Sequence, residues 1–241
     1  MAKQPIKKKK FDINSFKESK GLNVTKANMV VSAAEKPQDF IVMPEAFVEA
    51  TKLPGIPMGV TTIIHGHSNT GKSLLKNCLI ASAQKQGILP VIIETENNFS
   101  FPFAIDCGVD AEPVYGDVEV EETDIETGEI TTHTENRIIN YTGNFMYYDS
   151  EILVEKYGNF DHAQGKTVSK KRTVPVIEDV AMLVNELLTD QEEGRLPVPL
   201  LFVWDSVGSI PSFASLMSSR SNSMWDAKAL QESFNILLNK R

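Results

Sequence analysis

Continuous apolar runs alternate along this chain with longer stretches whose apolar residues recur at helical spacing. The runs are rich in β-branched residues, which predicts buried strands at 59–65, 89–95, 145–150 and 198–204. The helical pattern extends from Lys72 to about Gln86, resumes after Pro175 and returns from Trp225 to Arg241. Strands that alternate with helices and are apolar throughout indicate an α/β fold, with a mostly parallel sheet covered by helices on both faces.

Three segments depart from this alternation and carry most of the charge. Residues 1–43 are polar and weakly periodic, which predicts a basic N-terminal arm ahead of a core at 44–241. Residues 111–144 form an acidic insertion whose alternating pattern about Thr127–Gly128 predicts a β-hairpin-like excursion. Residues 156–174 are a basic loop, which either contacts phosphates or is simply solvated.

The net charge of −8 hides a strong separation of positive and negative residues. Residues 1–20 carry seven lysines against two acids, and residues 112–135 carry nine acids without a lysine or arginine. The basic loop contributes Lys156, Lys166, Lys170, Lys171 and Arg172. Each run is also what a solvated surface or a tail contains. The total charge therefore neither supports nor excludes a nucleic-acid partner.

Length and composition narrow the class of protein. A chain of 241 residues with 41% hydrophobic residues can build one α/β domain with a sizeable core. No apolar run approaches the roughly 20 residues of a membrane helix, and no apolar stretch of a secretory signal follows the basic N-terminus. Cys78 and Cys107 are too few for a disulfide framework and lack metal-ligand spacing. We therefore expect reduced thiols, a cytoplasmic location and no membrane partner.

The stretch IIHGHSNTGKSLL at residues 63–75 contains the pattern G-x-x-x-x-G-K-[ST] between a predicted strand and a predicted helix. The glycines let backbone N–H groups face a phosphate, and the helix start adds its own N–H groups and a positive dipole end. Lys72 would reach the β- and γ-phosphates, and the Ser73 hydroxyl would bind Mg²⁺. The alternative is an ordinary turn. The expected ATP-binding residues of the loop are Gly66, His67, Ser68, Asn69, Thr70, Gly71, Lys72 and Ser73.

An NTPase also needs an acid that holds the water shell of the metal and a base that orients the attacking water. Asp205 ends the last predicted strand, at the edge where open α/β sheets bind ligands, although an aspartate there can also cap a helix. Glu94 and Glu96 end the strand VIIETE. Strand alternation places both glutamates on one face, so spacing does not choose the base between them.

The chain contains the stretches LPGIPMGVTTIIHGHSNTGKS, AQKQGILPVIIETENNFSFPFAIDCGVD and LLFVWDSVGSIPS. These stretches, with the G-[IL]-P-M-G turn in the first, resemble the ATPase core of RecA-type recombinases. The resemblance covers roughly residues 53–110 and 197–211, with a looser likeness to residue 241, and is greatest to the bacteriophage branch. It implies a RecA-like P-loop NTPase core that uses ATP and Mg²⁺.

The resemblance also implies roles for individual residues. Glu96 would be the catalytic, water-activating glutamate, acting with Lys72, while Asp205 would hold Mg²⁺ through water together with Ser73. Phe103 would stack on the adenine, the alternative being a core phenylalanine. The first DNA-binding loop would lie at 212–224, where the alternative is a plain surface loop. Its candidate DNA contacts are Ser218, Ser219, Arg220 and Ser221.

The function that the resemblance implies is an ATP-dependent recombinase. Such a protein binds single-stranded DNA, forms homo-oligomeric filaments on it, and acts in homologous recombination and DNA repair. The alternatives are a replicative-helicase-type RecA-like motor, or a nucleotide-binding interaction module without turnover. A member of the phage branch would act in the host cytoplasm.

The sequence departs from the family pattern near its C-terminal end. In the family, a further strand lies between the phosphate-loop strand and the metal strand, ends in a glutamine that senses the γ-phosphate, and precedes a second DNA-binding loop. This sequence stops on a helix at ALQESFNILLNKR. We expect an incomplete core, inactive alone or completed by a second polypeptide. The alternative is direct pairing of the strands at 59–65 and 198–204.

Overall fold

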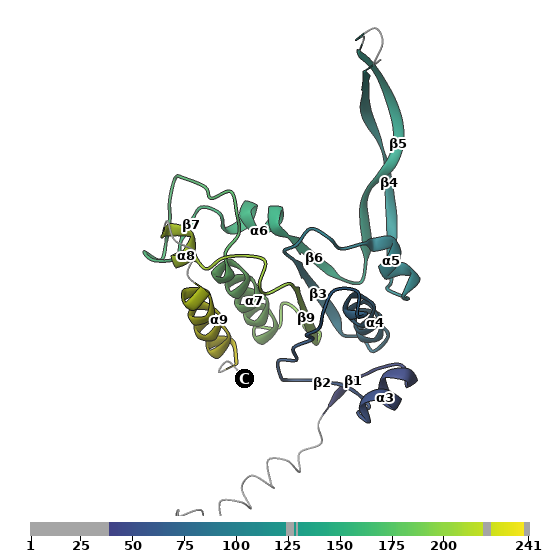
Figure 1. Ribbon diagram of the computed structural model, residues 1–241, viewed down its shortest axis with the longest axis vertical. Helices are drawn as coiled ribbons and strands as arrows, with labels where there is room; N and C mark the ends of the chain where they lie inside the picture. The colour runs from purple at the N-terminus through teal and green to yellow at the C-terminus, as the bar shows by residue number, and fades with distance from the viewer. Residues whose placement is uncertain (1–38, 124–127, 129, 219–222, 239–241) are drawn as a thin grey trace, which may run out of the picture. The chain divides into compact units, whose positions relative to one another are not determined.

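The computed structural model describes residues 39–123, 128, 130–218 and 223–238 (Figure 1). The described residues from Phe40 onward form one compact unit. Most of the predicted basic arm lies outside the described residues, as do Ser219, Arg220 and Ser221. The description below concerns the compact unit that begins at Phe40.

A three-stranded parallel sheet forms the centre of this unit. Its order is β6 (Met146–Asp149), β3 (Leu89–Glu94) and β9 (Leu200–Asp205). These are three of the four predicted strands, and the predicted α/β class with a parallel sheet is confirmed. The register sets Glu94 beside Asp149 on one side and beside Asp205 on the other. Three carboxylates therefore end adjacent strands.

Helices pack against β3 from two directions (Figure 1). Val91 and Ile93 lie in a core with α6 (Ser150–Tyr157) and α7 (Ile177–Glu192). Ile92 lies in a separate core with α4 (Lys72–Lys85) and α5 (Phe101–Asp106). Successive side chains of a strand point to opposite faces, so one strand supplies two cores.

The fourth predicted strand, at 59–65, is not formed. These residues link β2 (Gly55–Pro57) to α4 without strand pairing, and Ile63 is 84% exposed. A strand needs a neighbour for its backbone N–H and C=O groups, and within the described residues β9 pairs only with β3. The alternative in which 59–65 pairs directly with 198–204 is therefore wrong as well.

The outer edge of β9 matches this finding. All six residues of the strand are only half-buried, although five of the six are apolar. By contrast, five of the six residues of β3 are buried. Within the part of the chain that the structure describes, β9 is an edge strand with the composition of a central one.

A small unit that the sequence analysis did not predict precedes the phosphate-loop sequence. β1 (Phe40–Val42) pairs antiparallel with β2, and α3 (Glu45–Thr51) connects them. Ile41 and Ile56 pack against Leu79 and Ala83 of α4. A side chain at Gly55 would come within 1.9 Å of the Ile41 carbonyl, so this pairing requires glycine there.

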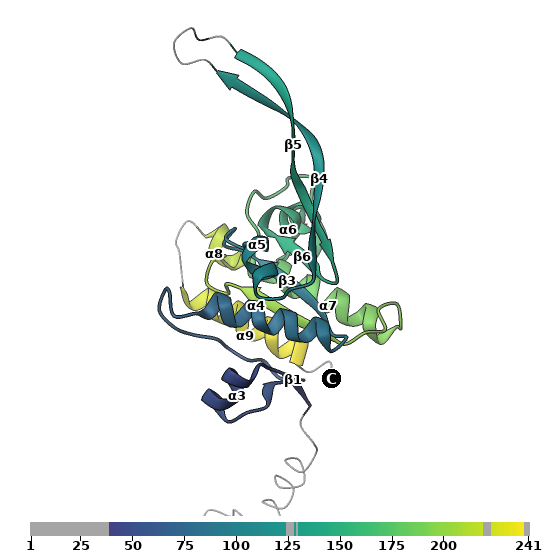
Figure 2. The same cartoon turned by 90° about the vertical axis from the view of Figure 1, so that its right-hand side faces the viewer.

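The acidic insertion forms the predicted hairpin, at greater length than its alternation alone indicated. β4 (Ala111–Thr123) and β5 (Ile130–Gly143) pair antiparallel, with an irregularity between Val114 and Tyr115 (Figure 2). At the base of the hairpin, Tyr141 stacks on Phe101 of α5, with ring centroids 4.3 Å apart. The hairpin is therefore anchored at its base by aromatic packing.

The basic loop and the C-terminal elements complete the unit. β7 (Phe160–Asp161) and β8 (Lys166–Thr167) form a short antiparallel pair inside the basic loop. α8 (Phe213–Met217) and α9 (Ser223–Leu238) follow β9, and α9 packs against α7. Among the described residues, no helix is both long and apolar enough to cross a membrane.

Candidate nucleotide-binding site

The phosphate-loop sequence forms a turn that leads into α4. Gly71 stands at the N-cap of this helix with φ +85°, and Asn69 has φ +61°. Both values lie in the left-handed region, which glycine adopts without strain and asparagine tolerates better than most residues. A side chain at Gly66 would approach the Thr70 hydroxyl to 2.9 Å. The backbone of the turn therefore favours glycine at both motif positions.

The Lys72 ammonium group is held inside this turn. Its Nζ donates to the carbonyl of His67 at 2.7 Å, and Thr70 Oγ1 donates to the same carbonyl at 2.8 Å. The N–H groups in the first turn of an α-helix have no acceptor within the helix. The helix start thus combines a cation, backbone donors and the exposed hydroxyl of Ser73. This combination suits an anionic phosphate.

Glu94 is a buried carboxylate at the carboxyl end of β3. Its side chain is 0% exposed, and Oε1 accepts a hydrogen bond from the backbone N–H of Glu96 at 2.9 Å. Burial raises the pKa of Glu94 above its ordinary value, while that hydrogen bond and the charge of Lys76 act in the opposite direction. Glu94 Oε2 has no hydrogen-bond partner among the described residues. Glu94 is thus sealed from solvent water.

Lys76 is a residue of this site that the sequence analysis missed. It lies one helical turn after Lys72, and its Nζ is 2.5 Å from Asp205 Oδ2 and 3.8 Å from Glu94 Oε2. The ammonium group also lies 4.9 Å from the ring centroid of Phe99. One buried cation therefore neutralises the carboxylates that end two adjacent strands.

The sequence did contain a signal for Lys76. Leu79 and Ile80 follow it at the i+3 and i+4 positions, and both are buried. A lysine on the apolar face of a helix needs an acidic partner, since an unpaired buried charge is costly. The ion pair ties α4 to the end of β9, and so places the phosphate loop near the acids of the sheet edge.

Glu96 lies beyond the end of β3 rather than on it. β3 ends at Glu94, so the prediction that the two glutamates share one strand face is wrong. The Glu96 carboxylate is exposed, and it accepts hydrogen bonds from Ser206 Oγ and, at 2.9 Å, from Asn98 Nδ2. A general base must reach water, and Glu96 has the access that Glu94 lacks.

Thr95, between the two glutamates, joins β3 to the segment after β9. Its hydroxyl accepts from Trp204 Nε1 at 3.1 Å and from Ser209 Oγ at 2.6 Å, and lies 3.0 Å from the Ser206 carbonyl. Its N–H donates to the Asp205 carbonyl at 2.8 Å. These bonds hold the ends of both strands together.

Phe103 lies on α5 and is 41% exposed. The alternative of a core phenylalanine therefore does not hold for Phe103. On this helix the packed ring is Phe101, which stacks on Tyr141 and also contacts Phe99, Phe145 and Tyr147. An exposed ring is free to contact a ligand, and adenine stacking stays a prediction.

The residues predicted to bind magnesium have suitable chemistry. Within the described residues, no group of three or more His, Cys, Asp or Glu side chains could hold a metal ion. Magnesium is usually held by one or two carboxylates together with substrate phosphates. The Ser73 hydroxyl and the Asp205 carboxylate are oxygen donors that fit a magnesium ion arriving with a nucleotide. Lys76 would have to share Asp205 with it.

The predicted DNA-binding segment at 212–224 begins with a short helix. Ser212 caps α8, its hydroxyl accepting from the Ser215 N–H at 3.1 Å. Ser218 is the C-cap residue of α8, its N–H donating to the Ala214 carbonyl at 3.0 Å. The other predicted DNA contacts, Ser219, Arg220 and Ser221, lie outside the described residues.

Curated proteins with similar sequences are RecA proteins. The RecA protein of Roseiflexus sp. (strain RS-1) is 36% identical over 73 residues, which is 28% of this chain and 21% of that protein. The RecA protein of Aquifex aeolicus (strain VF5) is 37% identical over 89 residues, or 34% of this chain and 26% of that protein.

The chain is related to RecA over part of its length. The matched stretches span only about a quarter of the RecA relatives, so the similarity is local. No protein-family model matches the chain, and no solved structure matches it. The relationship to RecA therefore rests on these sequence matches, and the sheet described above is compatible with a RecA-like core.

Proposed function

We propose that this protein is a RecA-like ATPase of the P-loop NTPase class, which binds single-stranded DNA and supports homologous recombination and DNA repair. One observation carries the proposal. The helix that opens with the phosphate-loop sequence is tied by Lys76 to Asp205, with 2.5 Å between Nζ and Oδ2. A phosphate loop and an acid at the end of a neighbouring strand are the two parts that a P-loop NTPase brings together.

We assign the described residues the following roles in ATP binding and hydrolysis. Residues 66–73 hold the phosphates of ATP, with Lys72 on the β- and γ-phosphates. Ser73 and Asp205 would hold Mg²⁺, and the bound ion would neutralise charge on the phosphates. Glu96 orients and deprotonates the attacking water, and Phe103 stacks on the adenine. Buried Glu94 positions Glu96 by accepting a hydrogen bond from its backbone N–H.

The DNA would bind at the segment after β9. Ser218, Ser219, Arg220 and Ser221 are the proposed contacts, and copies of the protein would assemble as a filament along the strand. Arg220 would supply the positive charge, because the release of counterions from neutralised phosphates contributes a large share of the affinity for nucleic acid. We place the protein in the cytoplasm. If it belongs to the bacteriophage branch, this is the cytoplasm of the host cell.

A second polypeptide, or a further segment, would complete the sheet. The half-buried apolar residues of β9 and the exposed Ile63 support this proposal. A strand inserted between β9 and residues 59–65 would pair with both and cover their apolar side chains. Leaving buried N–H and C=O groups unpaired costs about 1–3 kcal/mol each. We therefore propose that full activity requires this additional strand.

The decisive experiment measures ATP hydrolysis by residues 1–241 with and without single-stranded DNA, alone and with a C-terminal partner segment. Hydrolysis stimulated by DNA supports the proposal. ATP binding without turnover under all conditions would favour a nucleotide-binding interaction module. Electron microscopy of the DNA complex distinguishes a helical filament from the closed ring of a replicative-helicase-type motor. Full activity and cooperative unfolding of the chain alone would contradict the need for another strand.

A further inference from the structure

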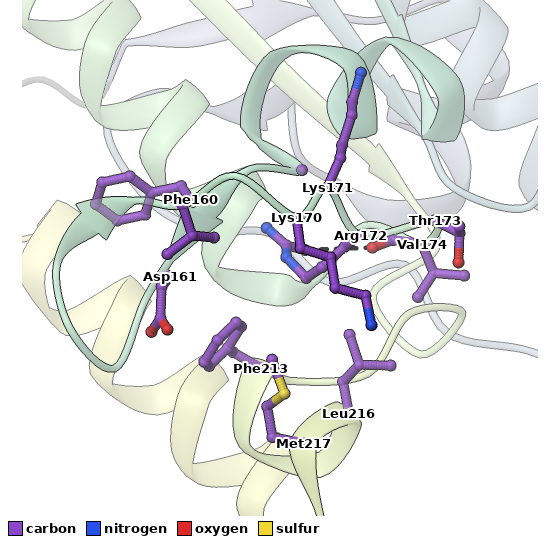
Figure 3. A pocket seen from close by; sticks show the side chains of 12 residues that line it. Phe160, Asp161, Lys170, Lys171, Arg172, Thr173, Val174, Phe213, Leu216 and Met217 are labelled. Carbon is purple, nitrogen blue, oxygen red and sulfur yellow. Dashed lines mark hydrogen bonds between the residues drawn. The ribbon is translucent and has the colours of Figure 1, made fainter.

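A cavity of about 490 Å³ lies between the basic loop and α8 (Figure 3). One wall is apolar and is formed by Phe213, Leu216 and Met217. The opposite wall is formed by Val168 and residues 170–174 of the basic loop, including Lys170, Lys171 and Arg172. The cavity is separate from the nucleotide-binding residues, none of which lines it.

Arg172 anchors the basic wall. Its guanidinium group donates to both carboxylate oxygens of buried Asp179, at 2.9 and 2.7 Å, and to the carbonyls of Tyr157 and Val174. A guanidinium has five N–H donors, and these four bonds use its two terminal nitrogens. The remaining donor, Nε, is buried and has no hydrogen-bond partner among the described residues. The Asp179 carboxylate therefore compensates the charge of Arg172, which holds the wall in place rather than offering a free cation.

Lys170 provides the exposed positive charge over the cavity. Its side chain extends toward Leu216, whereas that of Lys171 points the opposite way (Figure 3). Neither lysine forms a salt bridge within the described residues. The carboxylate that lines the cavity, Asp161, is already bonded to the N–H groups of Ala163 and Gln164 and to Gln164 Nε2. These bonds leave its negative charge in place, but Asp161 lies on the other side of the cavity from the Lys170 ammonium group (Figure 3). The Lys170 side of the cavity therefore favours an anion.

The apolar wall of the cavity is complementary to a ligand that carries an apolar group next to its anion. Met217 is 61% exposed. The Arg172 Cζ atom lies 5.7 Å from the ring centroid of Phe213. A nucleotide combines a phosphate with a flat base, and proteins that bind single strands place basic groups beside apolar or aromatic surfaces. An acidic peptide would match the charge of Lys170. Its carboxylates, however, are not each attached to a flat apolar group, as the phosphates of a nucleic acid are.

We infer that this cavity binds one nucleotide of a single-stranded nucleic acid, with a phosphate at Lys170 and the base against Met217 and Leu216. The inference rests on the proposed DNA-binding function and extends it. Phe213, Leu216 and Met217 of α8 line the cavity and belong to the predicted DNA-binding segment at 212–224. DNA bound at that segment would therefore meet the apolar wall of the cavity.

The test uses the full chain and a fluorescently labelled oligothymidylate, with affinity measured by anisotropy over a range of salt concentrations. Lys170→Ala should weaken binding roughly tenfold at low salt, as expected for one charge-assisted contact. It should also lower the slope of log affinity against log salt by about 0.7, the value for one phosphate on a single strand. Lys171→Ala is the matched control and should change both quantities much less.

A second variant tests the apolar wall. Met217→Glu puts a carboxylate on an exposed position, so folding is retained, and it should weaken DNA binding further than Met217→Gln does. Equal effects of Lys170→Ala and Lys171→Ala would overturn the inference, while DNA binding by the wild type would leave the proposed function standing. Unchanged affinity in both Lys170→Ala and Met217→Glu would also overturn it, and would leave the cavity to an acidic peptide. If the wild type does not bind the oligonucleotide even with the C-terminal partner segment of the hydrolysis experiment present, both proposals are refuted.

Discussion

The Nζ atom of Lys76 lies 2.5 Å from Oδ2 of Asp205, so the proposed metal-binding carboxylate already has a cationic partner. The same ammonium group lies 3.8 Å from Glu94, whose side chain is wholly buried. Charges held in this way depend on one another, because removing one partner leaves another uncompensated in a poorly solvated place.

Replacing Lys76 with methionine tests this dependence. Lys76→Met should lower the free energy of unfolding by about 3 kcal/mol, since it leaves two carboxylates without their cation. Mg²⁺ should restore part of the loss, because it can approach an Asp205 that no longer faces an ammonium group. Denaturant unfolding with and without Mg²⁺ measures both effects, and Lys85→Met on the exposed end of the same helix is the control. If Mg²⁺ stabilises the wild type and Lys76→Met equally, Lys76 does not compete for Asp205.

Lys72 should be indispensable for nucleotide binding. Lys72→Ala removes the ammonium group that now meets the His67 carbonyl, and a methyl group cannot replace its charge on the phosphates. We expect binding of a fluorescent ATP analogue to fall below detection while the unfolding transition is unchanged. Near wild-type binding or hydrolysis in this variant would remove the phosphate-loop interpretation.

The two glutamates should behave differently. Glu96→Gln should retain ATP affinity and lose hydrolysis by about a hundredfold or more, because an amide can hydrogen-bond to water but cannot accept its proton. Glu94→Gln should be milder, since the amide oxygen can still accept the N–H of Glu96. Single-turnover hydrolysis and equilibrium ATP binding separate the two effects. The reverse order of severity would assign the base to Glu94.

Ile63 distinguishes an exposed segment from a buried strand. At 84% exposure, Ile63→Asp should change the free energy of unfolding of residues 1–241 by no more than about 0.5 kcal/mol. It should also reduce self-association, measured by light scattering, because it interrupts an exposed apolar segment. Ile130→Asp on the hairpin, at a position 62% exposed, is the control. A loss of several kcal/mol would mean that the chain alone buries residues 59–65.

The strands at 89–94 and 200–205 were predictable because each is an apolar run long enough to decide its own conformation. Residues 59–65 are also rich in β-branched residues, yet they form no strand, because pairing depends on a neighbour that the local sequence does not encode. Composition thus gave the preference for a strand, and topology decided whether it could form.

In the candidate site, too, some residues follow from the local sequence and others only from the fold. The glycine positions and Lys72 follow from a motif of eight residues, and the chain order places them at the start of α4. Lys76 could not be assigned from the motif, because its partners Asp205 and Glu94 come from distant parts of the chain. Likewise, only the end of β3 at Glu94 separates the buried glutamate from the exposed Glu96.

The hydroxyl of Thr95 lies in a network of side-chain hydrogen bonds beside Glu96. It is bonded to Trp204 and Ser209, and Ser206 beside them donates to Glu96. If the proposed ATPase activity displaces Glu96, the displacement would reach Ser206 through this bond, and residues 206–209 precede α8 in the chain. The state of the nucleotide would then be coupled to α8 through hydroxyl groups, with the sheet unchanged.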